Sequence, residues 1–181
     1  LYRIGLERAK KIAIKQRIEL PVPVVVIGNI TVGGTGKTPL IMFLVQALTQ
    51  RGRRVGIVSR GYGARANRYP CKVMASDSAD LVGDEPLMLA QSLDAPVVID
   101  PDRLSAIMHL LETHAEVDVI LSDDGMQHYR MPRDLEILGV DGSRERNNEQ
   151  LLPEGPLREP LDGLKTVDFC LVNGGNENLS S

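Results

Sequence analysis

A glycine-rich stretch between an apolar run and a helical pattern constrains this chain more than any other feature. Residues 29–38 read Asn-Ile-Thr-Val-Gly-Gly-Thr-Gly-Lys-Thr and follow the apolar run 24–27. Apolar residues then recur at helical spacing, at positions 40, 43, 44, 47 and 48. A strand, a glycine loop, Gly-Lys-Thr and a helix in this order predict a phosphate-binding loop. Residues 29–38 are called the phosphate loop below.

The chemistry of such a loop is local. Glycines let backbone N–H groups turn toward an anion without a Cβ clash, and the N-terminus of the following helix adds positive potential. We expect Lys37 to reach the β- and γ-phosphates of ATP and the Thr38 hydroxyl to bind Mg²⁺. The residues predicted to contact the nucleotide within the loop are Thr31, Val32, Gly33, Gly34, Thr35, Gly36, Lys37 and Thr38.

The loop departs from the usual pattern at one position, because Thr31 stands where the first glycine is expected. A glycine-rich turn with a chance lysine is the alternative, and the flanking strand and helix argue against it. A dinucleotide-binding loop is excluded, since its glycine spacing is absent.

Composition narrows the class of protein. With 181 residues, 43% of them hydrophobic and 25% charged, the chain suits one globular domain. A net charge of −3, no Trp and two Phe give no case for nucleic-acid binding. Cys71 and Cys170 are in no metal-binding spacing, and we expect reduced thiols of a cytosolic domain. No apolar stretch is long enough to span a membrane, and no signal peptide is visible.

Residues 1–20 differ from the rest, because lysines and arginines alternate there with isoleucines and leucines. One interpretation is a basic amphipathic helix on an anionic membrane surface. The other is a solvated helix packed on the domain. The sequence leaves both open.

Strands and helices alternate along the remainder, which predicts an α/β fold: P-loop NTPase-like, mainly parallel, with helices on both faces. Strands are expected at 24–27, 55–58, 71–74, 96–99, 117–121, 135–140 and 167–172. A helix from residue 101 should bury Leu104, Ile107, Met108 and Leu111. His109 and His114 on it are expected to be structural or solvated.

Candidate polar residues follow the expected strands. Asp123 and Asp124 end an apolar strand, as in a Walker-B motif, and are predicted to hold Mg²⁺; an Asp-Gly turn is the alternative. Gln127 and His128 come within reach of the same edge. Arg60 follows the second strand and is placed to meet phosphate, or is a surface arginine.

Two further segments carry polar candidates. Asp84 and Glu85 open a helix, where an ordinary role is capping and favourable interaction with the helix dipole. Residues 141–160 form a long loop with Glu154, Arg158 and Glu159 as its candidate polar groups.

Five motifs in this order resemble the tetraacyldisaccharide 4′-kinases, the lipid A 4′-kinases of Gram-negative bacteria. They are the phosphate loop with its flanks (26–39), Ser-Arg-Gly-Tyr-Gly (59–63), Gly-Asp-Glu-Pro (83–86), Asp-Asp-Gly-Met-Gln-His (123–128) and Leu-Leu-Pro-Glu-Gly-Pro-Leu-Arg-Glu (151–159). The family carries Thr or Ser where Thr31 stands, which accounts for the departure noted above.

The resemblance implies a longer protein. Family members usually begin with a hydrophobic segment that docks on the inner membrane, and end with a second, smaller α/β domain that closes over the site. We therefore expect a fragment: a basic N-terminal segment (1–20), a nucleotide-binding kinase domain (21–175) and a polar tail (176–181) leading to a missing second domain.

The resemblance also implies the reaction. The γ-phosphoryl of ATP is transferred to the 4′-hydroxyl of an acylated glucosamine disaccharide 1-phosphate, giving lipid IVA in lipid A (lipopolysaccharide) biosynthesis, at the cytoplasmic face of the bacterial inner membrane. By motif position, Asp84 is the expected catalytic base, and Glu159 joins Thr38, Asp123 and Asp124 at the metal. Arg60, Gln127 and His128 line the site.

Two alternative functions are considered beside the kinase. A partner-regulated P-loop ATPase needs a second lysine at position 32 and a glycine before it, where this chain has Val32 and Thr31. A nucleotide-binding module without phosphotransfer is the second. The sequence gives no indication of oligomeric state.

Overall fold

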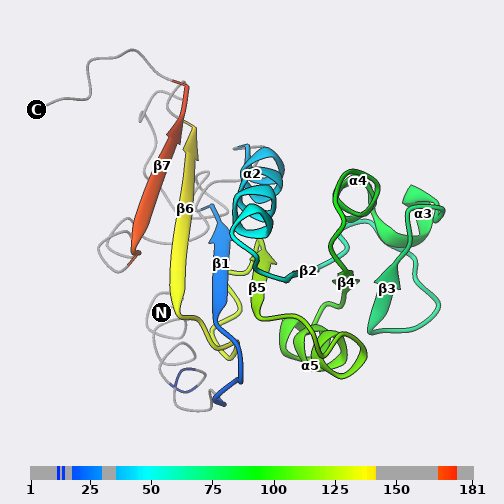
Figure 1. The fold of residues 1–181 in the computed structure, drawn as a ribbon. Helices are drawn as coiled ribbons and strands as arrows, with labels where there is room; N and C mark the ends of the chain where they lie inside the picture. The colour runs from blue at the N-terminus through cyan, green and yellow to red at the C-terminus, as the bar shows by residue number, and fades with distance from the viewer. Residues whose placement is uncertain (1–11, 13, 15–17, 30–35, 142–166, 175–181) are drawn as a thin grey trace, which may run out of the picture.

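The structure is a computed structural model and describes residues 12, 14, 18–29, 36–141 and 167–174. Within them, the strands and helices alternate as expected (Figure 1). The elements are β1 (Val24–Gly28), α2 (Lys37–Gln50), β2 (Val55–Ser59), β3 (Cys71–Val73), α3 (Ala79–Val82), α4 (Asp84–Ser92), β4 (Val97–Ile99), α5 (Arg103–Thr113), β5 (Val119–Asp123), β6 (Leu135–Asp141) and β7 (Phe169–Asn173). Each predicted strand is present with ends shifted by a residue or two, and the one-turn helix α3 was not predicted.

The strands form a single sheet in the order β3-β4-β2-β5-β1-β6-β7. All neighbouring pairs are parallel except β3 with β4, which is antiparallel. The predicted mainly parallel α/β fold is therefore confirmed. Because β1 runs parallel to both of its neighbours, β5 and β6, the loops that follow these three strands emerge at the same end of the sheet, which is called the carboxyl edge below.

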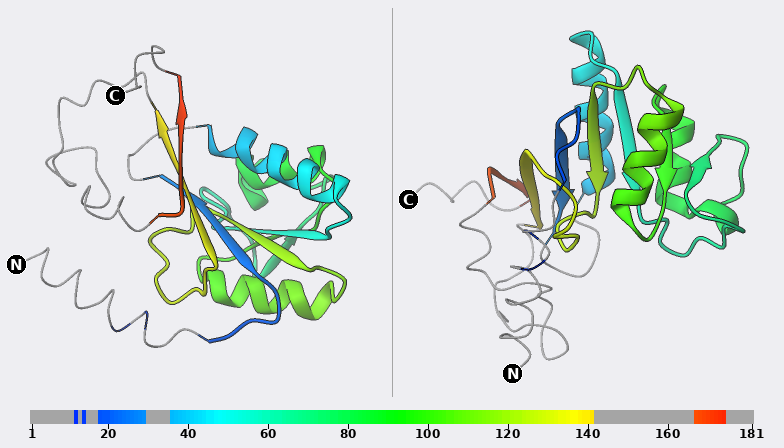
Figure 2. Two further views of the ribbon diagram at one scale, coloured as in Figure 1. Left: turned by 60° about the vertical axis from the view of Figure 1, so that its left-hand side comes forward. Right: turned by 90° about the horizontal axis from the view of Figure 1, so that it is seen from below.

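Helices cover both faces of the sheet, as the two views of Figure 2 show. Successive side chains of a strand point to opposite faces. Accordingly Val26 of β1 belongs to the core cluster that contains the inner side of α5, whereas Ile27 belongs to the cluster that contains the inner sides of α2 and α4. Burial on both faces explains why β1, β2 and β5 are nearly continuous apolar runs.

The buried side of α5 differs from the prediction. Of the four predicted residues only Ile107 is fully buried; the buried residues are Arg103, Ala106, Ile107 and Leu110, whereas Leu104 and Leu111 are half-buried and Met108 is 42% exposed. The Asp102 side chain accepts a hydrogen bond from the Leu104 N–H (3.0 Å), so it caps the helix and Arg103 is its first residue. The buried row has the expected spacing but starts at an arginine, which the apolar pattern could not reveal.

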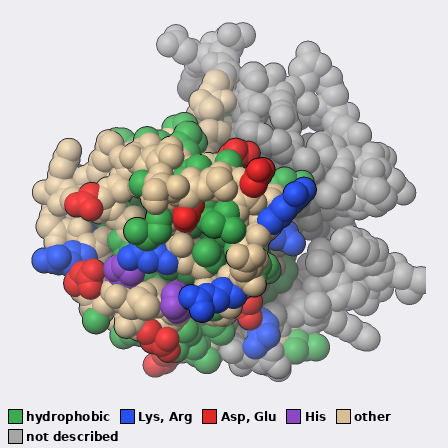
Figure 3. All heavy atoms as spheres, turned by 90° about the vertical axis from the view of Figure 1, so that its right-hand side faces the viewer, with side chains coloured by type: hydrophobic (Ala, Val, Ile, Leu, Met, Phe, Trp, Pro, Cys, Tyr) green, Lys and Arg blue, Asp and Glu red, His purple; other side chains and the backbone are tan. Residues whose placement is uncertain are grey.

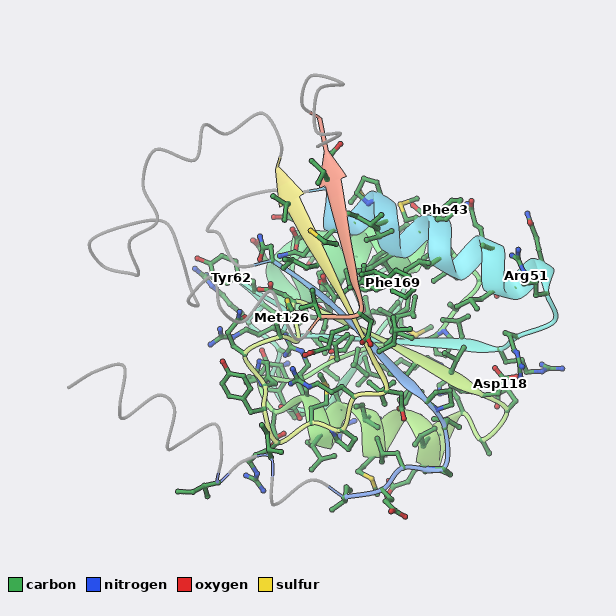
Figure 4. All side chains as sticks on the ribbon, turned by 90° about the vertical axis from the view of Figure 1, so that its left-hand side faces the viewer. Phe43, Arg51, Tyr62, Asp118, Met126 and Phe169 are labelled. Carbon is green, nitrogen blue, oxygen red and sulfur yellow. The ribbon has the colours of Figure 1, made fainter. Side chains whose placement is uncertain are left out.

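Helix α2 runs from the carboxyl edge to the opposite, amino edge. In Figure 4, Arg51 at the end of α2 and Asp118 before β5 lie at one end of the molecule, and Tyr62 and Met126 lie at the other. The N-terminus of α2 is thereby aimed at the carboxyl edge, as a phosphate site requires.

On the face of the molecule seen in Figure 3, acidic, basic and apolar side chains are interspersed, and neither sign of charge forms a separate patch. His114 lies 3.1 Å from Lys72 Nζ and 2.9 Å from Thr113 Oγ1, consistent with a structural role. Both cysteines are free thiols.

In the described ranges, no helix is long and apolar enough to cross a bilayer. Most of segment 1–20 lies outside those ranges; Ile12, Ile14 and Ile18 are exposed.

Candidate active site

Three buried polar residues meet at the carboxyl edge, one from each of the central strands. Asn29 follows β1, Ser59 ends β2 and Asp123 ends β5, and their exposed fractions are 0%, 4% and 2%. The register places Ile27 of β1 beside Asp123. The sheet alone thus brings together residues that are far apart in sequence.

Lys37 reaches this edge from the first turn of α2. Its Nζ donates to Asn29 Oδ1 (3.2 Å) and forms an ion pair with Asp124 Oδ1 (2.9 Å). Gly36, at the start of the helix, has a left-handed φ of 80° that glycine adopts without strain. Thr38 follows, half-buried, whereas Thr31, Val32, Gly33, Gly34 and Thr35 lie outside the described residues. Lys37 therefore sits where the sequence placed it, and its role stays a prediction.

Asp123 is the deeper of the two acidic residues. Its Oδ2 accepts a hydrogen bond from Ser59 Oγ (3.0 Å), and its Oδ1 has no partner among the described groups. Burial, followed by the negative charge of Glu85, raises its pKa to about 6, while Lys37 and the Ser59 hydrogen bond act in the opposite direction. At neutral pH the side chain is mainly a carboxylate, and one of its oxygens is buried without a hydrogen bond from the described groups.

Asp124 differs from its neighbour in backbone and in contacts. Its φ is 49°, the one positive value among non-glycine residues of the described ranges, and its carboxylate pairs with Lys37. The two predicted acidic residues therefore differ: Asp123 is buried, and Asp124 forms an ion pair with Lys37. The described residues contain no group of three or more metal-ligating side chains, and the third predicted carboxylate, Glu159, lies outside them.

Arg103 is a buried cation beneath this edge that the sequence did not single out. Its exposed fraction is 1%, and its guanidinium donates to the Asp100 carbonyl (2.8 Å) and the Asp123 carbonyl (3.3 Å). Burial lowers its pKa to about 10, with Asp123 and Asp124 opposing that shift, so it remains charged at neutral pH. Arg103 holds the backbone of Asp123 directly at the site.

The start of α4 also faces the site. Glu85 acts electrostatically on Asp123, and Gly83 packs so tightly that a Cβ there would lie 2.8 Å from the Tyr62 carbonyl oxygen. The capping role considered for Asp84 is wrong: the N-cap is Gly83, no side chain makes a cap hydrogen bond, and Asp84 is the exposed first residue. The sequence favoured Asp as a cap, but the left-handed φ of 89° at position 83 suits only glycine.

The remaining predicted residues surround the same edge. Arg60 is exposed directly after β2, and Gln127 and His128 are half-buried after β5. Burial and the charge of Arg103 lower the pKa of His128 to about 4, so its imidazole is neutral at pH 7. Arg133 fixes this loop by donating to the carbonyls of His128 (2.7 Å) and Met126 (3.1 Å).

Comparison with known proteins gives the family. The model for tetraacyldisaccharide-1-P 4′-kinases matches residues 1–181. The chain belongs to this family. It is 56% identical over 154 residues to the tetraacyldisaccharide 4′-kinase of Pseudomonas fluorescens (strain SBW25), a match that covers 85% of the chain and 46% of the relative. It is 53% identical over 155 residues to that of Legionella pneumophila (strain Corby), covering 86% and 48%.

A solved structure agrees. The chain superposes on LpxK from Aquifex aeolicus, crystallised in complex with ATP, with a TM-score of 0.74 and 31% identity, covering 96% of this chain and 59% of that one. The resemblance inferred from the five motifs is confirmed. The chain spans about half the length of the curated relatives it matches.

Sequence reasoning missed three residues of this family member's carboxyl edge: Asn29, Ser59 and Arg103. Asn29 and Ser59 lay inside quoted motifs, and their position directly at a strand end was the signal that could have found them. Arg103 carried only an indirect signal, an arginine directly after an Asp that caps a helix.

Proposed function

We propose that this chain forms the nucleotide-binding part of a kinase that transfers the γ-phosphoryl of ATP to the 4′-hydroxyl of tetraacyldisaccharide 1-phosphate, giving lipid IVA. The observation that carries the proposal is the meeting of Lys37, Asp123 and Asp124 at the carboxyl edge, in front of the N-terminus of α2. Membership of the family and the ATP bound to the Aquifex aeolicus structure support it.

The chain's own residues would share the work as follows. Lys37 and the N–H groups at the start of α2 bind the phosphates. Thr38, Asp123 and Asp124, with Glu159, would hold Mg²⁺; the buried, unpaired Asp123 Oδ1 fits this role because Mg²⁺ prefers hard oxygen ligands. Bound there, Mg²⁺ neutralises charge on the transferring phosphoryl group. Arg60, Gln127 and His128 line the site.

Asp84 would act as the base. The 4′-hydroxyl oxygen forms a bond to the γ-phosphorus, the bond from that phosphorus to the bridging oxygen of ADP breaks, and the hydroxyl proton passes to the Asp84 carboxylate. Asp84 is exposed at the start of α4, next to the residue whose charge acts on Asp123. An exposed carboxylate at this position is accessible to an acceptor that approaches from solvent, which supports the proposed role.

The acceptor carries acyl chains, so we propose peripheral contact with the inner membrane through the basic segment 1–20. Binding of the full-length protein to anionic vesicles should weaken steeply as salt rises, because surface charges are screened beyond about 10 Å at 0.1 M. Vesicle binding that does not depend on salt concentration would favour the alternative, in which segment 1–20 is a helix packed on the domain.

The deciding experiment supplies the full-length protein with γ-labelled ATP and the disaccharide lipid, and measures both labelled lipid and free phosphate. Lys37→Ala should reduce lipid labelling by roughly 10²-fold or more, the scale for losing one preorganised charge contact. Lys72→Ala, an exposed lysine on β3, is the matched control and should label normally. Phosphate release without labelled lipid would identify an ATPase, and nucleotide binding without either product would identify a binding module.

A further inference from the structure

The last residue of β7 lies against the phosphate loop. A Cβ built on Gly36 would be 2.7 Å from Asn173 Nδ2 and 3.5 Å from Asn173 Cγ, so the Asn173 side-chain amide occupies the space that a side chain at position 36 would need. Gly36 directly precedes Lys37 and begins α2. An amide from the outer strand of the sheet is thus placed at the residue where the phosphate loop becomes a helix.

Strand register explains this contact. Asn173 pairs with Asp141 at the end of β6, and Leu138 of β6 pairs with Gly28 at the end of β1. These parallel strands therefore present their final residues at the same carboxyl edge. Asn173 is the only polar residue of β7, and Gly174, with a φ of 72°, turns the chain immediately after it.

Strand order gives the direction in which a nucleotide must lie. The acidic residues Asp123 and Asp124 follow β5, on one side of β1, whereas Asn173 ends β7, on the other side beyond β6. In the proposed function the γ-phosphoryl points toward the acidic residues, because they would hold Mg²⁺ there and Asp84 would act as the base. The nucleoside end of the same molecule then extends past Gly36, toward β6 and β7.

We infer that Asn173 determines base specificity by hydrogen bonding to the adenine of the nucleotide; this rests on the proposed function. A side-chain amide has one acceptor oxygen and one NH₂ donor. Adenine offers the complementary pair, the N6 amino group and the N7 acceptor, and Asn binds this pair with two hydrogen bonds. Guanine offers O6 and N7, two acceptors, and leaves the amide oxygen without a donor.

The test measures nucleotide binding to the full-length protein by calorimetry, with ATP, GTP, 7-deaza-ATP and tripolyphosphate as probes. Asn173→Ala should weaken ATP binding roughly tenfold or more and bring the ATP and GTP affinities together, as expected for loss of a bidentate base contact. The parent should bind 7-deaza-ATP more weakly than ATP, and the variant should bind both alike. Tripolyphosphate, which has no base, should bind parent and variant equally.

Two further variants keep the test decisive. Val172→Ala, on the same strand and half exposed, should leave every affinity unchanged and shows that damage to β7 is not the cause. Asn173→Gln retains the amide and should keep part of the preference for ATP. An unchanged ATP-to-GTP ratio in Asn173→Ala overturns the inference, as does a loss of tripolyphosphate affinity equal to the loss for ATP, which would mean that Asn173 only supports the loop. Nucleotide binding is measured without lipid. The test of Asn173 therefore remains valid even if the proposed phosphotransfer is not observed.

Discussion

At the amino edge of the sheet, Asp118 and Arg53 pair in solvent, whereas Asp123 and Arg103 at the carboxyl edge are buried and incompletely hydrogen-bonded. Asp118, before β5, accepts a hydrogen bond from the Arg54 N–H (3.0 Å) and lies 3.7 Å from Arg53 Nη1, with side chains 40% and 62% exposed. Asp123, at the other end of the same strand, is buried with one carboxylate oxygen unpaired. Nearby Arg103 Nε and Ser122 Oγ also have no partner among the described groups.

This difference shows where stability is given up for chemistry. An unsatisfied buried polar group costs about 1–3 kcal/mol, whereas an exposed ion pair contributes about 0–1 kcal/mol. The exposed Asp118, just before β5, therefore has little effect on stability, whereas the buried Asp123, at the end of β5, destabilises the fold. Such conflicts are expected at functional sites, where a group must stay available to a ligand. Four substitutions test this contrast, from the largest expected effect to the smallest.

Asp84→Asn should have the largest effect. If Asp84 is the base, the variant loses roughly 10²–10⁴-fold in the rate of lipid phosphorylation and keeps its ATP affinity. Its melting temperature should change little, because Asp84 makes no cap hydrogen bond and only its interaction with the helix dipole, about 0.3–1 kcal/mol, is lost. Asp80→Asn, in the first turn of α3, is the control. Full activity in Asp84→Asn would remove Asp84 from the mechanism.

Asp123→Asn should abolish most activity and yet stabilise the fold. Raising a carboxyl pKa from 3.8 to about 6 corresponds to about 3 kcal/mol at about 1.36 kcal/mol per pKa unit, an upper estimate of the gain. Thermal unfolding and lipid phosphorylation, each measured from pH 4 to 8, test both parts.

The pH dependence has a definite sign. The native state binds the Asp123 proton more tightly than the unfolded chain, so between about pH 4 and 6 this residue makes the unfolding free energy fall as pH rises. Activity that needs the carboxylate should instead rise through about pH 6. Asp124→Asn is the comparison, since Asn tolerates the left-handed backbone there. An equal free energy of unfolding in parent and Asp123→Asn would mean that the buried Asp123 carboxylate does not destabilise the folded state.

Arg103→Lys should destabilise the protein by roughly 1–3 kcal/mol, because a lysine cannot donate to the Asp100 and Asp123 carbonyls with the same fork. Arg51→Lys is matched to it: Arg51 donates to the Ala47 carbonyl (2.9 Å) but is exposed at the amino edge. We expect that control to stay within about 0.5 kcal/mol. Denaturant unfolding compares the two, and equal losses would remove the contrast between the edges.

Asp118→Asn should have the smallest effect. The pair with Arg53 is exposed, and the Asn oxygen can still accept from the Arg54 N–H, so the loss should not exceed about 1 kcal/mol. Lipid phosphorylation should be unchanged. A larger loss than that of Arg103→Lys would reverse the ranking of the two edges.

The sequence by itself determined the alternation of strands and helices, the mainly parallel sheet and the positions of Lys37, Asp123 and Asp124 at strand and helix ends. These follow from local patterns: apolar periodicity selects the element, and glycine and aspartate mark where it ends. Parallel strands then bring their carboxyl ends to one edge, so a candidate site could be predicted without knowing its geometry.

Only the tertiary structure decided how the polar groups divide their contacts. Asp123 and Asp124 are adjacent in sequence, yet one is buried against Ser59 and the other pairs with Lys37. The buried face of α5 begins at Arg103 because carbonyls of two other segments receive its guanidinium. Asn173 meets Gly36 because strand register aligns β7, β6 and β1. Burial and charge depend on neighbours that are distant in the chain, and these are specified by packing, which no local pattern contains.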